Sequence, residues 1–296
     1  MGRTGFQRFG VPVSGAMDRY ALQIANILVG NPRNAACLEV TLIGPELEAC
    51  TPITVAITGA DLETKVNGNV KQMWTSFRMN KGDRLTFGKQ RSGVRAYIAI
   101  AGGFDSPRLF GSQSTDLNSG FGSQPNIGTD IIGFPGAAKH GIGLSKQLIP
   151  TYEKSVEIAM VEGPHTNFFT KDSLENFYRT THQVEANSNR MGYRLKSKRI
   201  SLRIDADIWS DAVPFGGIQV PGDGQPIILM ADRQTTGGYP RIGTVISNDL
   251  PKVAQLVPKG EIKFYPISVE AAQGRAIERE KLLRKLAVFQ KAFHHN

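Results

Sequence analysis

The chain has 296 residues, of which 40% are hydrophobic and 21% are charged, and its net charge is +9. This composition is ordinary for a soluble globular protein of one large or two modest domains. No apolar run approaches the roughly 18 residues of a membrane span, and no signal peptide opens the sequence. We therefore expect a cytoplasmic protein that does not enter a membrane.

The cysteine, histidine and charge patterns disfavour further classes of function. Cys37 and Cys50 show no metal-ligand or disulfide-framework spacing, so we expect two reduced thiols. No HExxH, CxxC or carboxylate cluster occurs, so no metal site is expected. Residues 275–296 contribute +4 of the charge without an aromatic stripe, which favours a solvated basic helix over a nucleic-acid surface.

The first predicted element is a helix that starts at Asp18, a residue type that caps helix N-termini. Leu22, Ala25 and Leu28 recur at helical spacing, and the Gly-Asn-Pro run at 30–32 ends the pattern. The free N–H groups around residues 14–18 either belong to simple capping or bind a carboxylate or phosphate.

Short β-like runs follow between glycine and proline turn signals, and their number predicts an all-β barrel or sandwich. In the run 38–41, alternation puts Glu39 and Thr41 on one face, and we expect Glu39 to form an internal salt bridge. The other predicted strands are 53–58, 84–87, 94–100, 156–161, 199–204, 217–220, 227–230, 243–246 and 262–267.

A domain boundary is predicted where Ala101-Gly102-Gly103 ends a strong strand and a Gly-, Ser- and Asn-rich segment begins. We predict an N-terminal β subdomain over 1–103, a barrel region over 104–267 and a C-terminal helix over 268–296. Glu270 lies near the positive end of that helix. An apolar stripe predicts that the helix docks on the parent domain or a partner. Its members are Leu282, Leu286, Phe289 and Phe293.

The most informative stretch is residues 225–247, where a short apolar strand is followed at once by many polar side chains. Asp232, Gln234, Thr235 and Tyr239 stand beside two glycines that allow the backbone to approach a ligand closely. Binding groups on a loop held by a rigid scaffold are typical of functional sites. The alternative is a plain polar hairpin turn.

Two further segments carry candidate binding groups. Ser114 and Asp116 lie in a hydroxyl-rich run that suits either an anion or nucleotide pocket or a surface turn. Asn189 suits a turn. Arg190 and Arg194, four residues apart, suit bidentate binding of a substrate carboxylate or carboxyphosphate.

Several common motifs are absent: the GxxxxGK[ST] phosphate loop, GxGxxG after a strand, the GxSxG nucleophile elbow and a Met-Lys-Met biotin acceptor. We therefore expect no covalent biotin on this chain, and if ATP is used we expect another protein of the same complex to bring much of that machinery.

Taken together, the motifs resemble the allophanate hydrolase subunit 2 family, also described as the 5-oxoprolinase C subunit or the biotin-dependent carboxyltransferase family. The resemblance covers residues 2 to about 272 and extends to the kinase-inhibitor antagonist of spore-forming bacteria and to part of urea carboxylase. The motifs that carry it are SGAMD, ANILVGN, LEVTLIGPELE, ITGAD, AGGF, GSQSTDL, SNRMGYRL, GGIQVPGDGQPIILMADRQTTGGYP and VISNDL.

The resemblance implies a cyclophilin-like β-barrel with an added β subdomain, and two partners that resemble the B-type and A-type proteins of 5-oxoprolinase. The implied activity is the ATP-dependent opening of 5-oxoproline to glutamate. Motif matching puts the substrate groove at Asn189, Arg190, Tyr193, Gln225, Asp232, Gln234, Thr235 and Tyr239, with Ser114 and Asp116 in a further family motif.

The start of the chain departs from that family, whose members usually begin with a strand and a Gln-Asp-x-Gly-Arg run. Here Met1 stands just ahead of Gly2-Arg3, so we predict an open sheet edge or a weakened core near the N-terminus.

For the mechanism, we expect Asn189, Gln234 and Thr235 to bond the amide edge of a lactam and Arg190 to offset developing negative charge. Asp232 is either a general base or an orienting acceptor. The alternatives are a regulator that sequesters a partner and a carboxyltransferase component acting on urea or allophanate. Peptidyl-prolyl isomerase activity rests on fold analogy alone.

Overall fold

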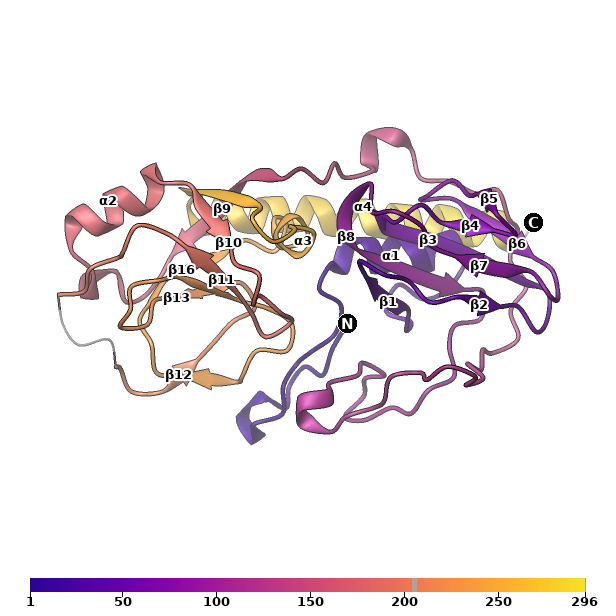
Figure 1. Cartoon of the computed structure of the whole chain (residues 1–296), viewed down its shortest axis with the longest axis horizontal. Coiled ribbons are helices and arrows are strands. Elements are labelled where there is room, and N and C mark those ends of the chain that lie inside the picture. Colours follow the sequence, from indigo (N-terminus) through magenta and orange to yellow (C-terminus); the bar gives the residue numbers. More distant parts are fainter. Residues whose placement is uncertain (204–206, 296) are drawn as a thin grey trace.

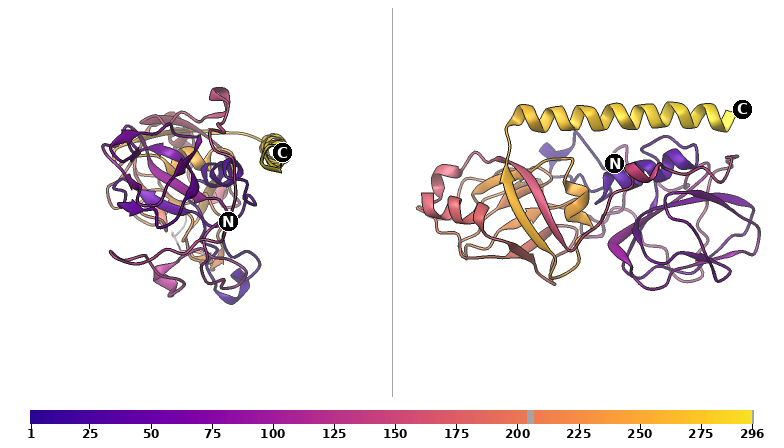
Figure 2. Two further views of the ribbon diagram at one scale, coloured as in Figure 1. Left: turned by 90° about the vertical axis from the view of Figure 1, so that its right-hand side faces the viewer. Right: turned by 90° about the horizontal axis from the view of Figure 1, so that it is seen from above.

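The computed structural model describes residues 1–203 and 207–295, with side chains in the last helix up to Phe289. Two β-rich units lie side by side, and a long C-terminal helix, α4 (Val269–His295), runs along one flank of both (Figures 1 and 2). The predicted fold class, mainly β with a barrel and a C-terminal helix, is confirmed. No helix in the described part of the chain is both long and apolar enough to span a lipid bilayer.

The N-terminal unit is built around two long strands that are almost wholly buried, β3 (Ile53–Asp61) and β8 (Ser92–Ile100). They are rich in β-branched and small apolar residues, as suits strands covered on both faces. With the edge strands β1 (Leu38–Thr41) and β6 (Ser76–Met79) they form an antiparallel sheet in the order β1-β8-β3-β6. The open sheet edge or weakened core predicted near the N-terminus stays a prediction.

A second small sheet, in the order β2-β7-β4-β5, encloses a hydrophobic cluster with the first. Its strands are β2 (Leu47–Glu48), β4 (Lys65–Val66), β5 (Asn69–Val70) and β7 (Arg84–Thr86).

Helix α1 (Arg19–Leu28) confirms the helix predicted after Asp18, whose carboxylate accepts a hydrogen bond from the Ala21 N–H at 2.9 Å. The helix packs on β3 and β8, where the Thr58 hydroxyl donates to the Ala21 carbonyl at 2.7 Å. Its other side contacts α4. The capping interpretation is therefore correct for Asp18.

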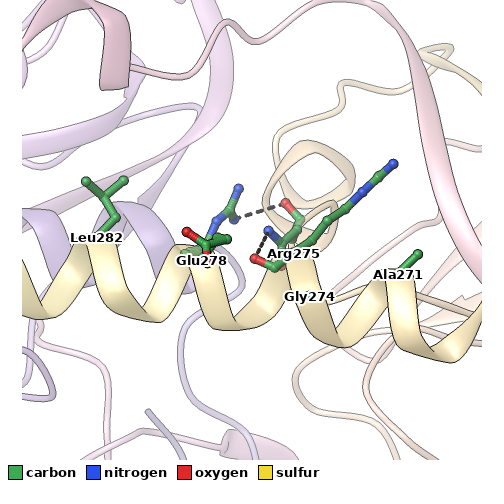
Figure 3. Close-up of a pocket in the computed structure, with 7 residues that line it drawn as sticks. Ala271, Gly274, Arg275, Glu278 and Leu282 are labelled. Atoms are coloured by element: carbon green, nitrogen blue, oxygen red, sulfur yellow. Dashed lines mark hydrogen bonds between the residues drawn. The ribbon is translucent and has the colours of Figure 1, made fainter.

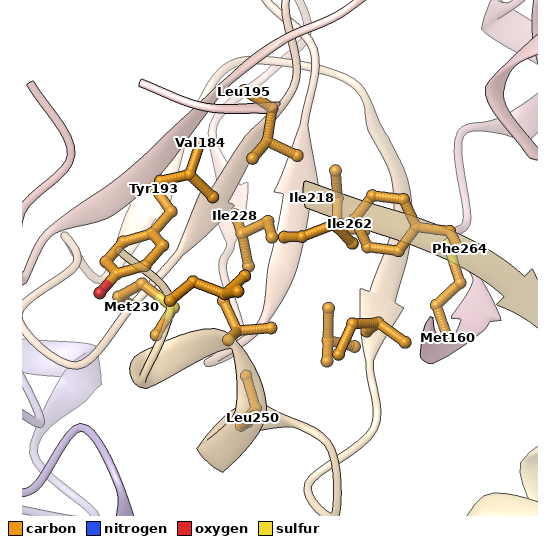
Figure 4. Close-up of a cluster of buried hydrophobic side chains, with 14 of the residues drawn as sticks. Met160, Val184, Tyr193, Leu195, Ile218, Ile228, Met230, Leu250, Ile262 and Phe264 are labelled. Carbon is orange, nitrogen blue, oxygen red and sulfur yellow. The ribbon is translucent and has the colours of Figure 1, made fainter. Parts of the chain in front are cut away.

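Seven strands of the second unit close into a barrel in the order β10-β11-β14-β13-β16-β9-β17. Neighbours are antiparallel apart from the parallel pair β9 and β17. Figure 4 shows the apolar side chains that fill the barrel, among them Ile218, Ile228 and Phe264. The strands are β9 (Ser155–Glu162), β10 (His182–Val184), β11 (Gly192–Lys196), β13 (Gly217–Gln219), β14 (Ile227–Leu229), β16 (Arg241–Val245) and β17 (Glu261–Pro266).

Smaller elements surround the barrel. β12 (Asp211–Ala212) pairs with β15 (Thr236–Gly237), α2 (Lys171–Arg179) packs on β17, and α3 (Leu250–Ala254) contacts β9 and α1. Short 3-10 helices cover Gln7–Phe9, Leu117–Ser119, Lys146–Leu148 and Thr166–Phe168.

The strand predicted at 199–204 is wrong for the described residues, where Leu202 makes only an isolated bridge to Phe169; residue 204 lies outside the described part. The strand in this region is β11, in which Tyr193 and Leu195 alternate inward. Its exposed Arg and Lys residues made this alternation easy to read as a polar binding segment.

The long segment 104–154 packs with the N-terminal unit. Ile131 joins the cluster between the two sheets, and Ile142, Leu144 and Tyr152 join the cluster around α1. The barrel strands begin only at Ser155. We therefore propose a boundary near residue 154 in place of the one predicted at 103.

Helix α4 docks on the parent domain, as predicted, through Leu286 of the predicted stripe together with Leu283 and Ala287. Leu283 is 2% exposed and packs with Leu286 and Ala287 against the α1 cluster, whereas Phe289 is 64% exposed. Phe289 therefore does not dock on the parent domain, and its docking on a partner stays a prediction; the side chain of Phe293 lies outside the described part of the chain.

Candidate functional site

The structure brings Arg190 and Asp232 into direct contact. Arg190 lies two residues before β11 and Asp232 lies three residues after β14, and these strands pair antiparallel with Gly192 opposite Leu229. The backbone N–H of Asp232 donates to the Arg190 carbonyl at 2.9 Å. The side chains form a bidentate ion pair, with Nε to Oδ2 at 2.7 Å and Nη2 to Oδ1 at 3.0 Å. The polar runs around 190 and 232 therefore meet because of strand pairing.

The N-terminal unit completes this ion pair. Glu39 from β1 accepts a short hydrogen bond from Arg190 Nη1, and the Gly15 carbonyl accepts one from Nη2 at 2.6 Å. Ser14 Oγ lies 2.6 Å from Asp232 Oδ1. Every nitrogen of the Arg190 guanidinium thus donates within the protein, and the pair links the two units.

Glu39 confirms the prediction of an internal salt bridge. Its carboxylate accepts hydrogen bonds from the Tyr97 hydroxyl at 2.8 Å and the Met17 N–H at 3.1 Å. Burial by itself raises the pKa of Glu39, but Arg190 and Arg95, with these hydrogen bonds, hold that pKa below its usual value. Glu39 is therefore a charged partner at the contact between the units.

Tyr193 does not line a groove, which corrects its prediction as a substrate-binding residue. It is 3% exposed, and Figure 4 shows it beside Val184 and Met230 in the barrel core. Its hydroxyl accepts a short hydrogen bond from Arg95 and lies 3.4 Å from the Ala254 carbonyl. The residue joins the barrel core to the N-terminal unit.

Three of the predicted binding residues, Asn189, Gln234 and Tyr239, have exposed side chains. Asn189 adjoins Arg190 in the sequence, and the other two lie in the loop that follows Asp232. Asn189 is exposed, and its side-chain oxygen accepts a hydrogen bond from the Met191 N–H at 2.8 Å, as expected for a turn. Gln234 is exposed and Tyr239 is 41% exposed. Thr235 is half-buried, and its carbonyl pairs with the Val213 N–H at 3.1 Å.

Gln225 lies away from this group. It precedes β14, whereas Asp232 follows that strand, so the two residues lie at opposite ends of it. Its side-chain oxygen accepts a hydrogen bond from the Ser197 N–H at 2.8 Å and so holds a turn. This corrects its prediction as a groove residue.

Ser114 and Asp116 approach the site from the 104–154 segment. Arg3 donates to Ser114 Oγ at 3.2 Å, and Ser14 Oγ lies 3.1 Å from the Thr115 carbonyl oxygen. Asp116 caps the 3-10 helix Leu117–Ser119, accepting from the Ser119 N–H at 3.4 Å and its hydroxyl at 3.1 Å. The turn interpretation therefore accounts for Asp116.

A shallow groove of about 570 Å³ lies elsewhere, between α4 and Asn248 (Figure 3). Arg279 donates to the Asn248 carbonyl there at 3.0 Å. None of the sequence-predicted site residues lines this groove. Among the described residues, no group of three His, Cys, Asp or Glu side chains is placed to hold a metal ion.

Sequence reasoning missed Arg95 and Tyr97 as parts of this network. Arg95 is 5% exposed within β8. A charged residue inside an otherwise apolar central strand was the available signal, because a buried charge needs a partner.

Comparison with known proteins places this arrangement in a family. The chain is 38% identical to the 5-oxoprolinase C subunit of Escherichia coli K12 over 290 residues, covering 97% of this chain and 93% of that protein. It is 32% identical to urea amidolyase of Lachancea kluyveri, covering 92% of this chain but 16% of that protein.

The crystal structure of K. lactis urea amidolyase superimposes with a TM-score of 0.90 at 30% identity, covering 96% of this chain and 19% of that one. Residues 9–266 match the family model for the carboxyltransferase domain, subdomain A and B. This match covers both β units and the ion-pair network between them, so the chain belongs to the carboxyltransferase domain family, subdomain A and B.

Proposed function

We propose that this chain is the C subunit of an ATP-dependent 5-oxoprolinase complex that opens 5-oxoproline to glutamate. The observation that carries the proposal is the 38% identity to the Escherichia coli protein over nearly the full length of both chains. In this proposal a B-type and an A-type protein of 5-oxoprolinase assemble with the chain. ATP binds in the assembled complex, since this sequence has no GxxxxGK[ST] loop.

The lactam would lie on the exposed side of the Arg190–Asp232 ion pair. Asn189 and Gln234 have exposed side chains there, and together with Thr235 they would bond the amide edge of the ring. Arg190 would act indirectly, because each of its guanidinium nitrogens already donates to Glu39, Asp232 or Gly15.

The geometry supports an orienting role for Asp232 over a general-base role. Both of its carboxylate oxygens accept from Arg190, and Oδ1 also lies 2.6 Å from Ser14 Oγ. Taking up a proton would weaken this pair, so the carboxylate better serves to hold the loop that presents Gln234 and Thr235.

The test is glutamate formation by the purified chain mixed with its two partner proteins, 5-oxoproline and ATP. We expect turnover only in the full mixture. Replacing the exposed Gln234 by Ala should raise KM or lower kcat at least several-fold, whereas the control Asp130→Asn, also at an exposed residue, should leave both unchanged. Asp232→Asn should lower kcat; near-normal turnover would remove Asp232 from the mechanism. A stable complex without turnover would favour the regulator.

A second function, carboxyl transfer to urea, is favoured by the structural match to K. lactis urea amidolyase at a TM-score of 0.90. The same purified chain, supplied with a biotin carboxylase and a biotinylated carrier, tests it. ATP- and bicarbonate-dependent consumption of urea, with no reaction on 5-oxoproline, would replace the first proposal by this one.

A further inference from the structure

Two arginines from different units contact one aromatic ring next to the candidate site. The Arg19 guanidinium carbon lies 4.9 Å from the centre of the Phe215 ring, and that of Arg233 lies 5.6 Å from it. Arg19 is the first residue of α1, and Arg233 follows Asp232 in the barrel unit. The loop between β12 and β13 carries Phe215.

Neither arginine forms an ion pair with a carboxylate in the described part of the chain. Arg233 is 8% exposed, and its hydrogen bonds go to the neutral carbonyls of Val213 at 3.0 Å and Met230 at 3.3 Å. The Nε of Arg19 is buried and has no hydrogen-bond partner among the described residues.

The nearby acids face other groups. Asp232 is turned toward Arg190 and Ser14. The Asp18 carboxylate accepts from the Tyr152 hydroxyl and the Gln255 amide, both at 3.0 Å. Neither carboxylate therefore neutralises the pair of guanidinium groups.

Unpaired like charges in such a place are unfavourable. Burial, with the charge of Arg19 as a smaller cause, lowers the pKa of Arg233 to about 10, and burial lowers the pKa of Arg19 too. The attraction of a cation to an aromatic ring offsets only part of what burying an unpaired ion costs. A bound anion would neutralise the charge of the two guanidinium groups and offset the cost of burying them.

We propose that Arg19 and Arg233 bind the carboxylate of the substrate 5-oxoproline. Guanidinium groups bind carboxylates through two parallel hydrogen bonds. The segments that carry the two arginines are joined by the 2.6 Å contact of Ser14 with Asp232. In this proposal the two arginines bind the carboxylate and the loop that carries Gln234 binds the amide edge. This inference rests on the proposed function.

Arg19→Met is the decisive variant, because the Arg19 side chain makes no hydrogen bond to a described residue and its loss should leave the fold intact. In the reconstituted complex we expect KM for 5-oxoproline to rise about tenfold to a hundredfold, the loss of one charge-assisted contact, with kcat little changed. Arg78→Met, an exposed arginine on β6, is the matched control and should change neither constant.

Calorimetric titration of the full chain gives a second readout that does not need turnover. Wild type should bind 5-oxoproline more tightly than pyrrolidin-2-one, which lacks the carboxylate, and Arg19→Met should shrink that difference at least tenfold. Normal KM in an active Arg19→Met complex would overturn the carboxylate site and leave the proposed function standing. If the wild-type complex is inactive, the proposed function fails, and the titration decides the site: equal binding of the two ligands, or none, overturns it.

Discussion

Replacing Glu39 by Gln should show how strongly the two units depend on their shared ion pair. The change keeps the side-chain volume but removes the charge that faces Arg190 and Arg95. Removing one partner of a buried ion pair costs about 3–5 kcal/mol. The Glu39 side chain is 17% exposed and Gln can still accept a hydrogen bond, so we expect about 2–4 kcal/mol at pH 7.

The loss should depend on pH with a definite sign. The folded-state pKa of Glu39 lies below the usual value of 4.5, so its contribution is complete above about pH 4.5 and disappears as the pH falls through the lowered value. The difference in free energy of unfolding between wild type and Glu39→Gln should therefore be constant from pH 6 to 8 and shrink in acid.

Urea unfolding followed by circular dichroism measures this difference. The matched control is Glu48→Gln, since Glu48 pairs with Arg84 at 3.2 Å with both side chains more than half exposed, and such a pair contributes at most about 1 kcal/mol. The reasoning would be refuted if Glu39→Gln lowered the free energy of unfolding no more than the control does. It would also be refuted if the difference between wild type and Glu39→Gln were the same at pH 7 and pH 3.5.

Three further predictions follow from the packing and from the shifted pKa values. Leu283→Ala should cost about 2–3 kcal/mol and speed proteolysis of α4, whereas Val288→Ala, 69% exposed on the same helix, should do neither. Burial lowers the pKa of His182 below 6.5, so the free energy of unfolding, measured by urea titration, should fall as the pH drops below about 6.5. His182→Leu should flatten this slope, and an unchanged slope would contradict the assignment. Burial raises the pKa of the Cys37 thiol to about 12. A thiol reagent at pH 8 should therefore label the exposed Cys50 quickly and Cys37 only after denaturation, and rapid labelling of both thiols in the folded protein would contradict the packing.

Much of the secondary structure could be predicted from local patterns. The Asp18 cap and the Gly-Asn-Pro stop delimit α1, and apolar runs predict the central strands β3 and β8, because these signals are contained within about ten residues. β11 was not predicted, because its local pattern is ambiguous. Its inward residues, Tyr193 and Leu195, are separated by charged residues, so the run resembles a binding segment.

The site needed the tertiary structure. That Asp232, Arg190 and Asn189 belong to polar runs is visible in the sequence, but their mutual positions follow from the register of β11 against β14. Gln225 belongs to the same polar stretch and was predicted to line the same groove. The direction of β14, however, puts Gln225 at the end of that strand opposite to Asp232.

The sequence by itself determined the elements, the mainly β class and the family resemblance, because turns, caps and apolar periodicity act over a few residues. Only the tertiary structure decided that Glu39 faces Arg190 across a separation of 151 residues and that Arg19 and Arg233 share one aromatic ring. Which buried charge meets which depends on how the two units pack, and that packing is a sum of many distant contacts that no local pattern contains.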